Sequence, residues 1–205
     1  MKKRITIIGC GPGDANYLLP VAQKAIAEAD IVLGHERLLQ LFSHTNTAPL
    51  PAHSQDAIAV VEEHLGKGSV VVLASGDTGL FSITEKLVEH FGAEKCQVFP
   101  GISSVQVAFA KLALSWDDAR ILSAHGRTPE IRAEELATCK KIAILGGTTN
   151  AQQWVGSLAA ELETTHKLIV CENLTLPKEQ IREMKPGQLA EEEFCSLVIF
   201  LLIRR

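Results

Sequence analysis

The chain has 205 residues, of which 46% are hydrophobic, and its 24 acidic and 20 basic side chains give a formal net charge of −4. This length supports one sizeable core or two small ones. The lack of a long Lys/Arg run argues against a nucleic-acid partner, and the longest apolar run, SLVIFLLI, is too short to cross a membrane. The basic start leads directly into an apolar stretch and then glycines, so we expect a first strand there and not a signal peptide.

Apolar strand-like runs alternate with helical patterns along the whole chain. Strands are expected over residues 4–10, 30–34, 70–74, 97–99, 120–123, 142–145, 168–171 and 196–203. Apolar spacings of three and four predict helices over 18–29, 55–65, 81–91, 104–114, 151–162 and 177–184. The alternation, together with strands that are apolar throughout, favours an α/β protein with mostly parallel sheets.

A domain boundary is expected in the segment LSWDDA, which follows a long helix and precedes a new strand. It predicts an N-terminal α/β domain over residues 1–114 and a C-terminal α/β domain over 115–205, each of an ordinary size. Ligands often bind between two such domains, so the cleft between them is the expected place for a site.

The five cysteines are scattered along the chain, and none belongs to a CxxC pair. An odd number of isolated cysteines is typical of buried thiols in a reducing compartment and argues against a disulfide framework. The histidines lack the spacing of metal ligands. We therefore expect a cytoplasmic protein without a metal site of its own.

The first glycine-rich loop is GCGPGD, residues 9–14, directly after the first apolar run. The dinucleotide fingerprint is GxGxxG, whereas here the glycines alternate and Pro12 removes a backbone donor that a pyrophosphate would need. No GxxxxGK[ST] sequence is present, so a phosphate loop of that kind is excluded. A plain strand-to-helix turn and a close approach of the backbone to a ligand both remain open for this loop.

Two more loops follow expected strands in the first half. In LASGDTGLFS, residues 73–82, Asp77 could accept a hydrogen bond from a ligand or cap a helix that should begin at Leu80 or Phe81. In FPGISSV, residues 99–105, one of Ser103 and Ser104 could cap the next helix, and the other could face the same cleft as Asp77. Such loops lie at the carboxyl ends of strands, where open α/β sheets bind ligands.

The second half carries two similar loops, SAHGRT at 123–128 and ILGGT at 144–148. A lone histidine such as His125 is more often structural than catalytic. An arginine two residues later, Arg127, in a glycine loop at a strand end favours an anionic ligand.

Taken together, GCGPGD, SGDTGLFS, FPGISS and SAHGR resemble, in order and spacing, the motifs of the S-adenosylmethionine-dependent tetrapyrrole methylases, over essentially the whole chain. The stretch from FPGISSVQ to LALSWDDARILSAHGR most resembles the branch that methylates C5 of precorrin-7, with or without cobalt, in cobalamin biosynthesis. Some members of this branch carry a second domain that methylates C15 and decarboxylates. The chain ends at Arg205 without one, so we expect the stand-alone form and a separate C15-methyltransferase as a partner.

The resemblance also implies a fold, a cofactor and a set of contacts. The fold is two α/β domains with the active site between them, the cofactor is S-adenosyl-L-methionine, the substrate is a tetrapyrrole, and the assembly is a homodimer. Loop 9–14 should face the tetrapyrrole. The implied cofactor contacts are Pro12, Asp77, Leu80, Phe81, Ser103, Ser104, Ala124, Leu145 and Gly146. Thr78 departs from the family, whose members commonly have proline there.

The same resemblance suggests roles for three polar residues. His125 is a hypothesis for an acid/base or substrate-orienting group, because histidine titrates near neutrality. Arg127 is a candidate clamp for one of the acetate or propionate arms of the ring. Asp14 could contact a ring nitrogen or cap the first helix, and we favour the cap.

Three alternative functions remain open for the same residues. An NAD-dependent oxidoreductase needs an acidic residue after the second strand, where Glu36 is roughly placed, but the glycine spacing fails. A methylase of the same superfamily could act at another precorrin position, or on protein or RNA, although the absence of a basic face and the presence of SAHGR argue against the last two. A non-catalytic metabolite-binding module is the third alternative.

Overall fold

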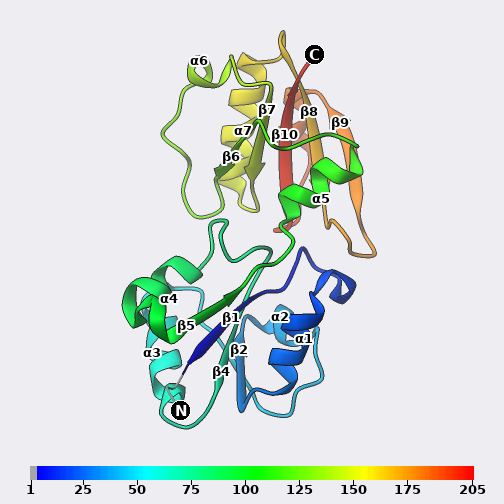
Figure 1. Ribbon diagram of the computed structural model, residues 1–205. Helices are drawn as coiled ribbons and strands as arrows, with labels where there is room; N and C mark the ends of the chain where they lie inside the picture. Colours follow the sequence, from blue (N-terminus) through cyan, green and yellow to red (C-terminus); the bar gives the residue numbers. More distant parts are fainter. Residues whose placement is uncertain (1–3) are drawn as a thin grey trace. The chain divides into compact units, whose positions relative to one another are not determined.

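The computed structural model describes residues 4–205 (Figure 1). The chain divides into two compact units, of which the first ends at Ser103 and the second runs from Ser104 to Arg205. The expected boundary lay after residue 114. The difference is helix α5 (Ser104–Lys111), which contacts strand β10 (Val198–Arg204) of the second unit.

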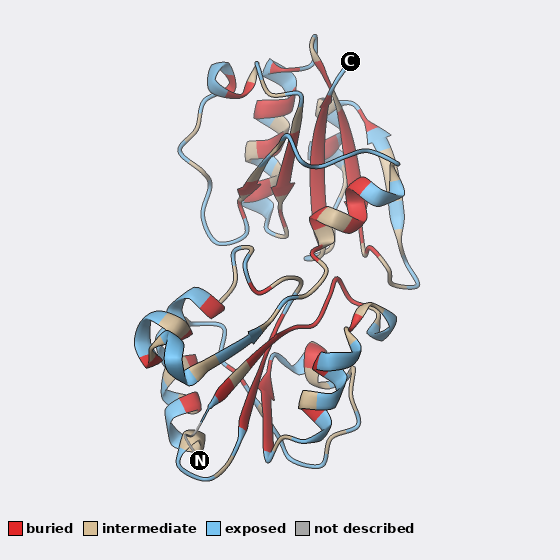
Figure 2. Cartoon of the chain, viewed as in Figure 1, coloured by how far each residue is buried: buried red, intermediate tan, exposed pale blue. Residues whose placement is uncertain are grey.

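The first unit is built on a five-stranded sheet in the order β3-β2-β4-β1-β5, and every pairing in it is parallel. The strands are β1 (Ile5–Gly9), β2 (Ile31–Gly34), β3 (Thr47–Pro49), β4 (Val70–Ala74) and β5 (Cys96–Phe99). All residues of β2 and β4 are buried, which explains their continuous apolar sequence (Figure 2).

Helices cover both faces of this sheet. They are η1 (Ala15–Tyr17), α1 (Pro20–Ala27), α2 (Glu36–Leu39), α3 (Ser54–Leu65), α4 (Thr84–Phe91) and η2 (Ala93–Lys95). One core cluster packs α3 and α4 against Ile5, Ile7 and their neighbours, and another packs α1 and α2 against Ile8, Val71 and theirs. Successive strand residues therefore serve opposite cores.

The second unit has a five-stranded sheet in the order β6-β7-β10-β8-β9. Its strands, besides β10, are β6 (Ala119–Ser123), β7 (Lys141–Leu145), β8 (His166–Glu172) and β9 (Gln180–Met184). Only the β6–β7 pairing is parallel, and the other three are antiparallel. The expectation of mostly parallel sheets is therefore correct for the first unit and wrong for the second.

The remaining helices of the second unit are α6 (Ala133–Leu136), α7 (Thr149–Glu161) and η3 (Pro186–Glu191). Helix α7 packs Val155 and Leu158 against a core cluster that includes Phe200 of β10. The predicted helix over 177–184 is wrong, because β9 occupies its last five residues and pairs with β8. Within residues 4–205 no helix is long and apolar enough to span a membrane.

Candidate active site

Three of the loops singled out from the sequence lie along one edge of the first unit's sheet. They follow β1, β4 and β5, which are parallel neighbours in the order β4-β1-β5. Their carboxyl ends therefore point to the same edge, which is where open α/β sheets bind ligands. The fold thus brings together segments that begin about 65 and 90 residues after the first loop.

The glycines of these loops touch one another through their backbones. Gly11 and Gly76 exchange two hydrogen bonds, from the Gly11 nitrogen to the Gly76 oxygen at 3.1 Å and in return at 2.9 Å. A Cβ atom added to Gly9 would lie 2.5 Å from the nitrogen of Gly101, and one added to Gly101 would collide with the Gly76 carbonyl oxygen. Glycine at positions 9 and 101 is thus required by packing between the loops themselves.

Asp77 ties two of these loops together. Its Oδ1 accepts a hydrogen bond from the backbone nitrogen of Gly79, and its Oδ2 accepts one from that of Gly101, both at 2.9 Å. The hydroxyl of Thr78 adds a weaker link to the Phe99 carbonyl at 3.3 Å. Asp77 does not cap the next helix, since α4 begins at Thr84 and not at residue 80 or 81. The carboxylate therefore has a structural task at the edge of the sheet.

The loop before α4 presents an aromatic side chain. Phe81 adopts a φ of 49°, in the left-handed region that residues with a Cβ rarely occupy, and its side chain is 60% exposed. Leu80 beside it is half-buried. A strained backbone that holds an exposed phenyl ring is a feature found at ligand sites.

The other predicted residues near these loops are Pro12, Asp14, Ser103 and Ser104. Pro12 is buried and follows Gly11 directly, and Ser103 is buried at the end of the third loop. Ser104 is the first residue of α5 and begins the second unit. Asp14 accepts a hydrogen bond from the Asn16 nitrogen at 2.7 Å and caps the short η1, whereas the N-cap of α1, the helix expected over 18–29, is Leu19.

The second unit brings four predicted residues together at the ends of its two parallel strands. The Ala124 nitrogen donates to the Leu145 carbonyl at 2.9 Å, and the Nδ1 atom of His125 lies 2.7 Å from the carbonyl oxygen of Gly146. Because a carbonyl only accepts, this contact places the proton on Nδ1. The Nε2 atom of a neutral His125 then carries the lone pair.

Gly146 and Gly147 make room for this arrangement. A Cβ on Gly146 would lie 2.5 Å from the ring of Phe200, and one on Gly147 would lie 3.0 Å from the His125 Nδ1 atom. Gly147 also has a φ of 113°. Gly146 is thus required by its packing against Phe200, and Gly147 by its contacts with the Ser196 carbonyl oxygen and with the imidazole of His125.

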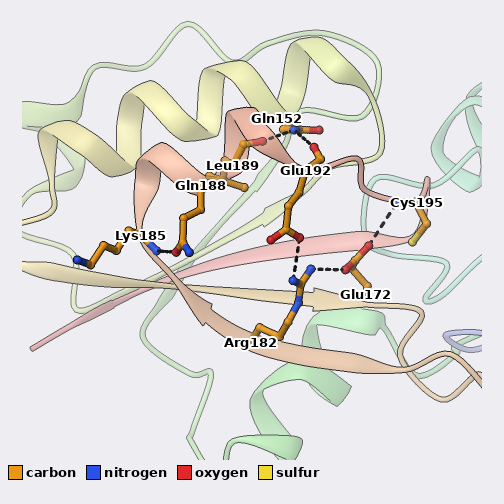
Figure 3. Close-up of polar contacts among 8 residues, drawn as sticks. All are labelled: Gln152, Glu172, Arg182, Lys185, Gln188, Leu189, Glu192 and Cys195. Atoms are coloured by element: carbon orange, nitrogen blue, oxygen red, sulfur yellow. Dashed lines mark hydrogen bonds and ion pairs between the residues drawn. The ribbon is translucent and has the colours of Figure 1, made fainter.

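A cavity of about 470 Å³ opens beside Gly147, within the size range of small-molecule sites. Its walls include Thr148 and Gln152 at the start of α7 and residues 192–195. Figure 3 shows how side chains hold that wall: Gln152 donates to the carbonyls of Leu189 and Glu192, and Arg182 pairs with Glu172 at 3.0 Å and Glu192 at 2.7 Å. The sequence analysis did not find this wall, because nothing local marks residues 192–195.

Arg127 is exposed, and among residues 4–205 no carboxylate pairs with it. A Cβ added to the preceding Gly126 would meet nothing within 4 Å. Within residues 4–205 no hydrogen bond or ion pair joins Arg127 to the other predicted residues, and its side chain is exposed.

Arg37 was missed by the sequence analysis. It lies on α2 after β2, is half-buried, and donates from Nη2 to the hydroxyl of Ser75 at 3.1 Å. Burial lowers the pKa of Arg37 and raises the pKa of the nearby Cys10 thiol to about 12, a rise that the charge of Arg37 opposes. No local sequence signal separates it from other helical arginines.

Among residues 4–205, no group of three or more His, Cys, Asp and Glu side chains is arranged to hold a metal ion. The five cysteines are free thiols, and Cys10 and Cys171 are buried.

Known proteins share the sequence and the fold of this chain. The chain is 33% identical over 202 residues to the cobalt-precorrin-7 C(5)-methyltransferase of Salmonella typhimurium, with 95% of this chain and 98% of that protein covered. The fold matches the precorrin-6Y methylase of Archaeoglobus fulgidus with a TM-score of 0.78 at 22% identity, covering 99% of both chains. It also matches the uroporphyrin-III C-methyltransferase of Thermus thermophilus complexed with S-adenosylhomocysteine, with a TM-score of 0.79 at 20% identity, over 98% of this chain and 97% of that one.

The family model for the tetrapyrrole (corrin/porphyrin) methylases matches residues 4–190. This range contains the strand-end loops of both units, including GCGPGD, SGDTGLFS and SAHGR. The chain therefore belongs to the tetrapyrrole (corrin/porphyrin) methylase family.

Proposed function

We propose that this chain transfers a methyl group from S-adenosyl-L-methionine to C5 of cobalt-precorrin-7 in cobalamin biosynthesis. The observation that carries the proposal is the 33% identity to the Salmonella typhimurium enzyme, which extends over nearly the full length of both chains. Methylation at another ring position is a less favoured reading, and the NAD-dependent alternative has no support in family membership.

The residues at the edge of the first sheet fit such a cofactor. A sulfonium cofactor combines a positive charge with an aromatic adenine, and the loop 75–83 offers the carboxylate of Asp77 and the exposed ring of Phe81. We assign cofactor contacts to Pro12, Asp77, Leu80, Phe81 and Ser103 of the first unit and to Ser104, Ala124, Leu145 and Gly146 of the second. The Thermus relative bound to S-adenosylhomocysteine supports the choice of cofactor.

The cofactor, when bound, supplies an electrophilic methyl group. In the transfer a carbon–carbon bond forms at C5, the carbon–sulfur bond breaks, its electron pair stays on sulfur, and a proton leaves the ring. Nε2 of His125 has the free lone pair to accept that proton, because Nδ1 is engaged with Gly146. The loops otherwise contribute alignment of the reacting groups.

Arg127 is assigned to substrate binding. Its guanidinium is exposed and has no carboxylate partner among residues 4–205, so its donors are available to an acetate or propionate arm of the ring. We also expect a homodimer in the cytoplasm, with a separate protein for the C15 step. Sedimentation of the purified protein would measure whether it is a dimer.

The test is a reaction with cobalt-precorrin-7 and S-adenosylmethionine labelled with ¹³C in the methyl group. The proposal predicts a product heavier by one methyl group, with the label bonded to C5 in the carbon spectrum. A label at another ring carbon would favour the other methylases of the family. No transfer under conditions where the Salmonella enzyme is active would contradict the proposal.

Variants separate the two assigned roles. His125→Ala should lower kcat by about 100-fold if Nε2 accepts the proton, and Arg127→Ala should raise KM for the tetrapyrrole with little change in kcat. Arg132→Ala serves as the control, since Arg132 is an exposed arginine that pairs with Glu135 at the start of α6. If both variants match the control, the roles given to SAHGR are wrong.

A further inference from the structure

Arg37 lies across the carboxyl ends of three neighbouring strands of the first unit. It follows β2, its Nη2 atom donates to Ser75, which directly follows β4, and its charge acts on Cys10, which directly follows β1. The sheet order β2-β4-β1 makes these strand ends adjacent. The guanidinium therefore lies at the same edge as the loops 9–14 and 75–83.

Within residues 4–205, no counterion compensates the positive charge of Arg37. A guanidinium has five N–H donors, and the contact with Ser75 uses one of them. No carboxylate among residues 4–205 forms an ion pair with Arg37. The Cys10 thiol cannot neutralise it, because a thiol with a pKa of about 12 is uncharged at neutral pH.

Arg182, the other half-buried arginine within residues 4–205, has charged partners. The half-buried Arg182 has two carboxylate partners, Glu172 and Glu192, and stacks over Phe194 with 6.0 Å between the guanidinium carbon and the ring centroid. Withdrawing a charge from water is costly unless an opposite charge compensates it. Arg37 bears that cost without a partner in the described chain, at an edge where ligands bind.

We propose that Arg37 binds a carboxylate of the ligand at this edge, with Ser75 holding the guanidinium in place. The inference rests on the proposed function, which supplies two carboxylate sources: a peripheral arm of the tetrapyrrole and the methionyl carboxylate of the cofactor. Both present the same planar group, which a guanidinium contacts through two parallel N–H donors. Lysine cannot reproduce that geometry.

The experiment compares Arg37→Met, Arg37→Lys and Ser75→Ala with Arg4→Met. Arg4 is exposed and directly precedes β1, at the amino end of the same sheet, so its variant makes the same charge change away from the edge. The dissociation constants of uroporphyrin III, S-adenosylhomocysteine and 5′-methylthioadenosine are measured for each protein, together with Tm. The last probe lacks the carboxylate.

If the carboxylate belongs to the tetrapyrrole, Arg37→Met should weaken the affinity for uroporphyrin III about 10- to 100-fold and leave the affinities for both adenosine probes unchanged. A cofactor source predicts the same loss for S-adenosylhomocysteine alone, with 5′-methylthioadenosine unchanged. Arg37→Lys and Ser75→Ala should give intermediate losses. Affinities for all three probes equal to those of Arg4→Met, or a fall in Tm without a loss of affinity, would overturn the proposal and leave Arg37 a structural tie.

The proposed function and this inference fail in different ways. Absence of methyl transfer by the unchanged protein contradicts the function, whereas the ratio of affinities between Arg37→Met and Arg4→Met decides the role of Arg37. If Arg37→Met does not fold, Arg37→Lys and Ser75→Ala carry the comparison. The first keeps a cation and the Ser75 hydroxyl at the contact, and the second keeps the guanidinium.

Discussion

In the first unit the loops after β1, β4 and β5 touch through their backbones, with Gly9, Gly76 and Gly101 in mutual contact. In the second unit, side chains hold the corresponding wall, through Gln152 and the ion pairs of Arg182 (Figure 3). Backbone packing tolerates no added atom, whereas a side-chain network can lose one member and relax. The two units should therefore respond differently to substitution.

The largest effect is expected where backbone meets backbone. Gly101→Ala places a Cβ against the Gly76 carbonyl oxygen and should cost about 3 kcal/mol or more of unfolding free energy, because neither backbone can yield without breaking the loop junction. Gly66→Ala is the control, since a Cβ there meets nothing within 4 Å. Denaturant unfolding measures both, and hydrogen exchange should show the loss in β1, β4 and β5. Equal stability of the two variants would refute the packing requirement.

Breaking the ion-pair network of the second unit should cost less unfolding free energy. Arg182→Met leaves the Glu172 carboxylate, which is 9% exposed, without its cation and should cost about 2 kcal/mol, below the value for a fully buried pair because Arg182 is partly exposed. Lys167→Met breaks an exposed pair with Glu183 on the same two strands and should cost under about 1 kcal/mol. Urea titration of both variants measures the difference. If Arg182→Met loses no more unfolding free energy than Lys167→Met, the network does not stabilise the second unit as we expect.

Asp77 combines backbone packing with a side-chain contact, because its carboxylate joins two loops that also touch through their backbones. Asp77→Asn keeps one acceptor but turns an amide donor toward the nitrogen of Gly79 or Gly101, so a loss of about 1–2 kcal/mol is expected. Asp56→Asn, at an exposed position in α3, should lose under about 1 kcal/mol. Thermal unfolding would show which loss is larger, and a neutral Asp77→Asn would mean that the loops hold without this tie.

The smallest effect concerns Glu179 of the second unit, and it depends on pH. Hydrogen bonds from Lys111 and from the Thr175 nitrogen hold the pKa of Glu179 below its ordinary value of 4.5. A lowered folded pKa gives stability that is fully present above the unfolded value and is lost as the pH falls through the folded value. Glu179→Gln should therefore lower stability by about 0.5–1 kcal/mol near pH 7. The difference in Tm from the unchanged protein should shrink as the pH falls below 4.5 and through the lowered pKa of Glu179, and a difference that does not shrink would contradict this assignment.

The comparison also explains which elements the sequence could predict. Strand β4 was predicted at residues 70–74, its observed bounds, because a parallel strand buried on both faces gives a continuous apolar run. Strand β9 was mistaken for a helix, because it is an edge strand whose residues are mostly not buried and whose only sheet partner is β8. Its conformation is decided by that partner and not by its own sequence.

The same holds for the candidate site. The glycine loops and His125 could be found from local patterns at strand ends. The contact between Gly101 and Gly76 could not, since it depends on β1 lying between β4 and β5. Arg37 became visible only through its burial, its bond to Ser75 and its lack of a carboxylate partner within residues 4–205. Local sequence thus identifies candidate loops, and tertiary neighbours decide what each residue does.

The most direct test of the central claim is a calorimetric titration of the protein with S-adenosylhomocysteine, in parallel with NADH. The account predicts saturable binding of S-adenosylhomocysteine that Phe81→Ala weakens, and no binding of NADH. Binding of NADH without binding of S-adenosylhomocysteine would contradict the methyltransferase assignment and leave the strand-end glycines with their structural role alone.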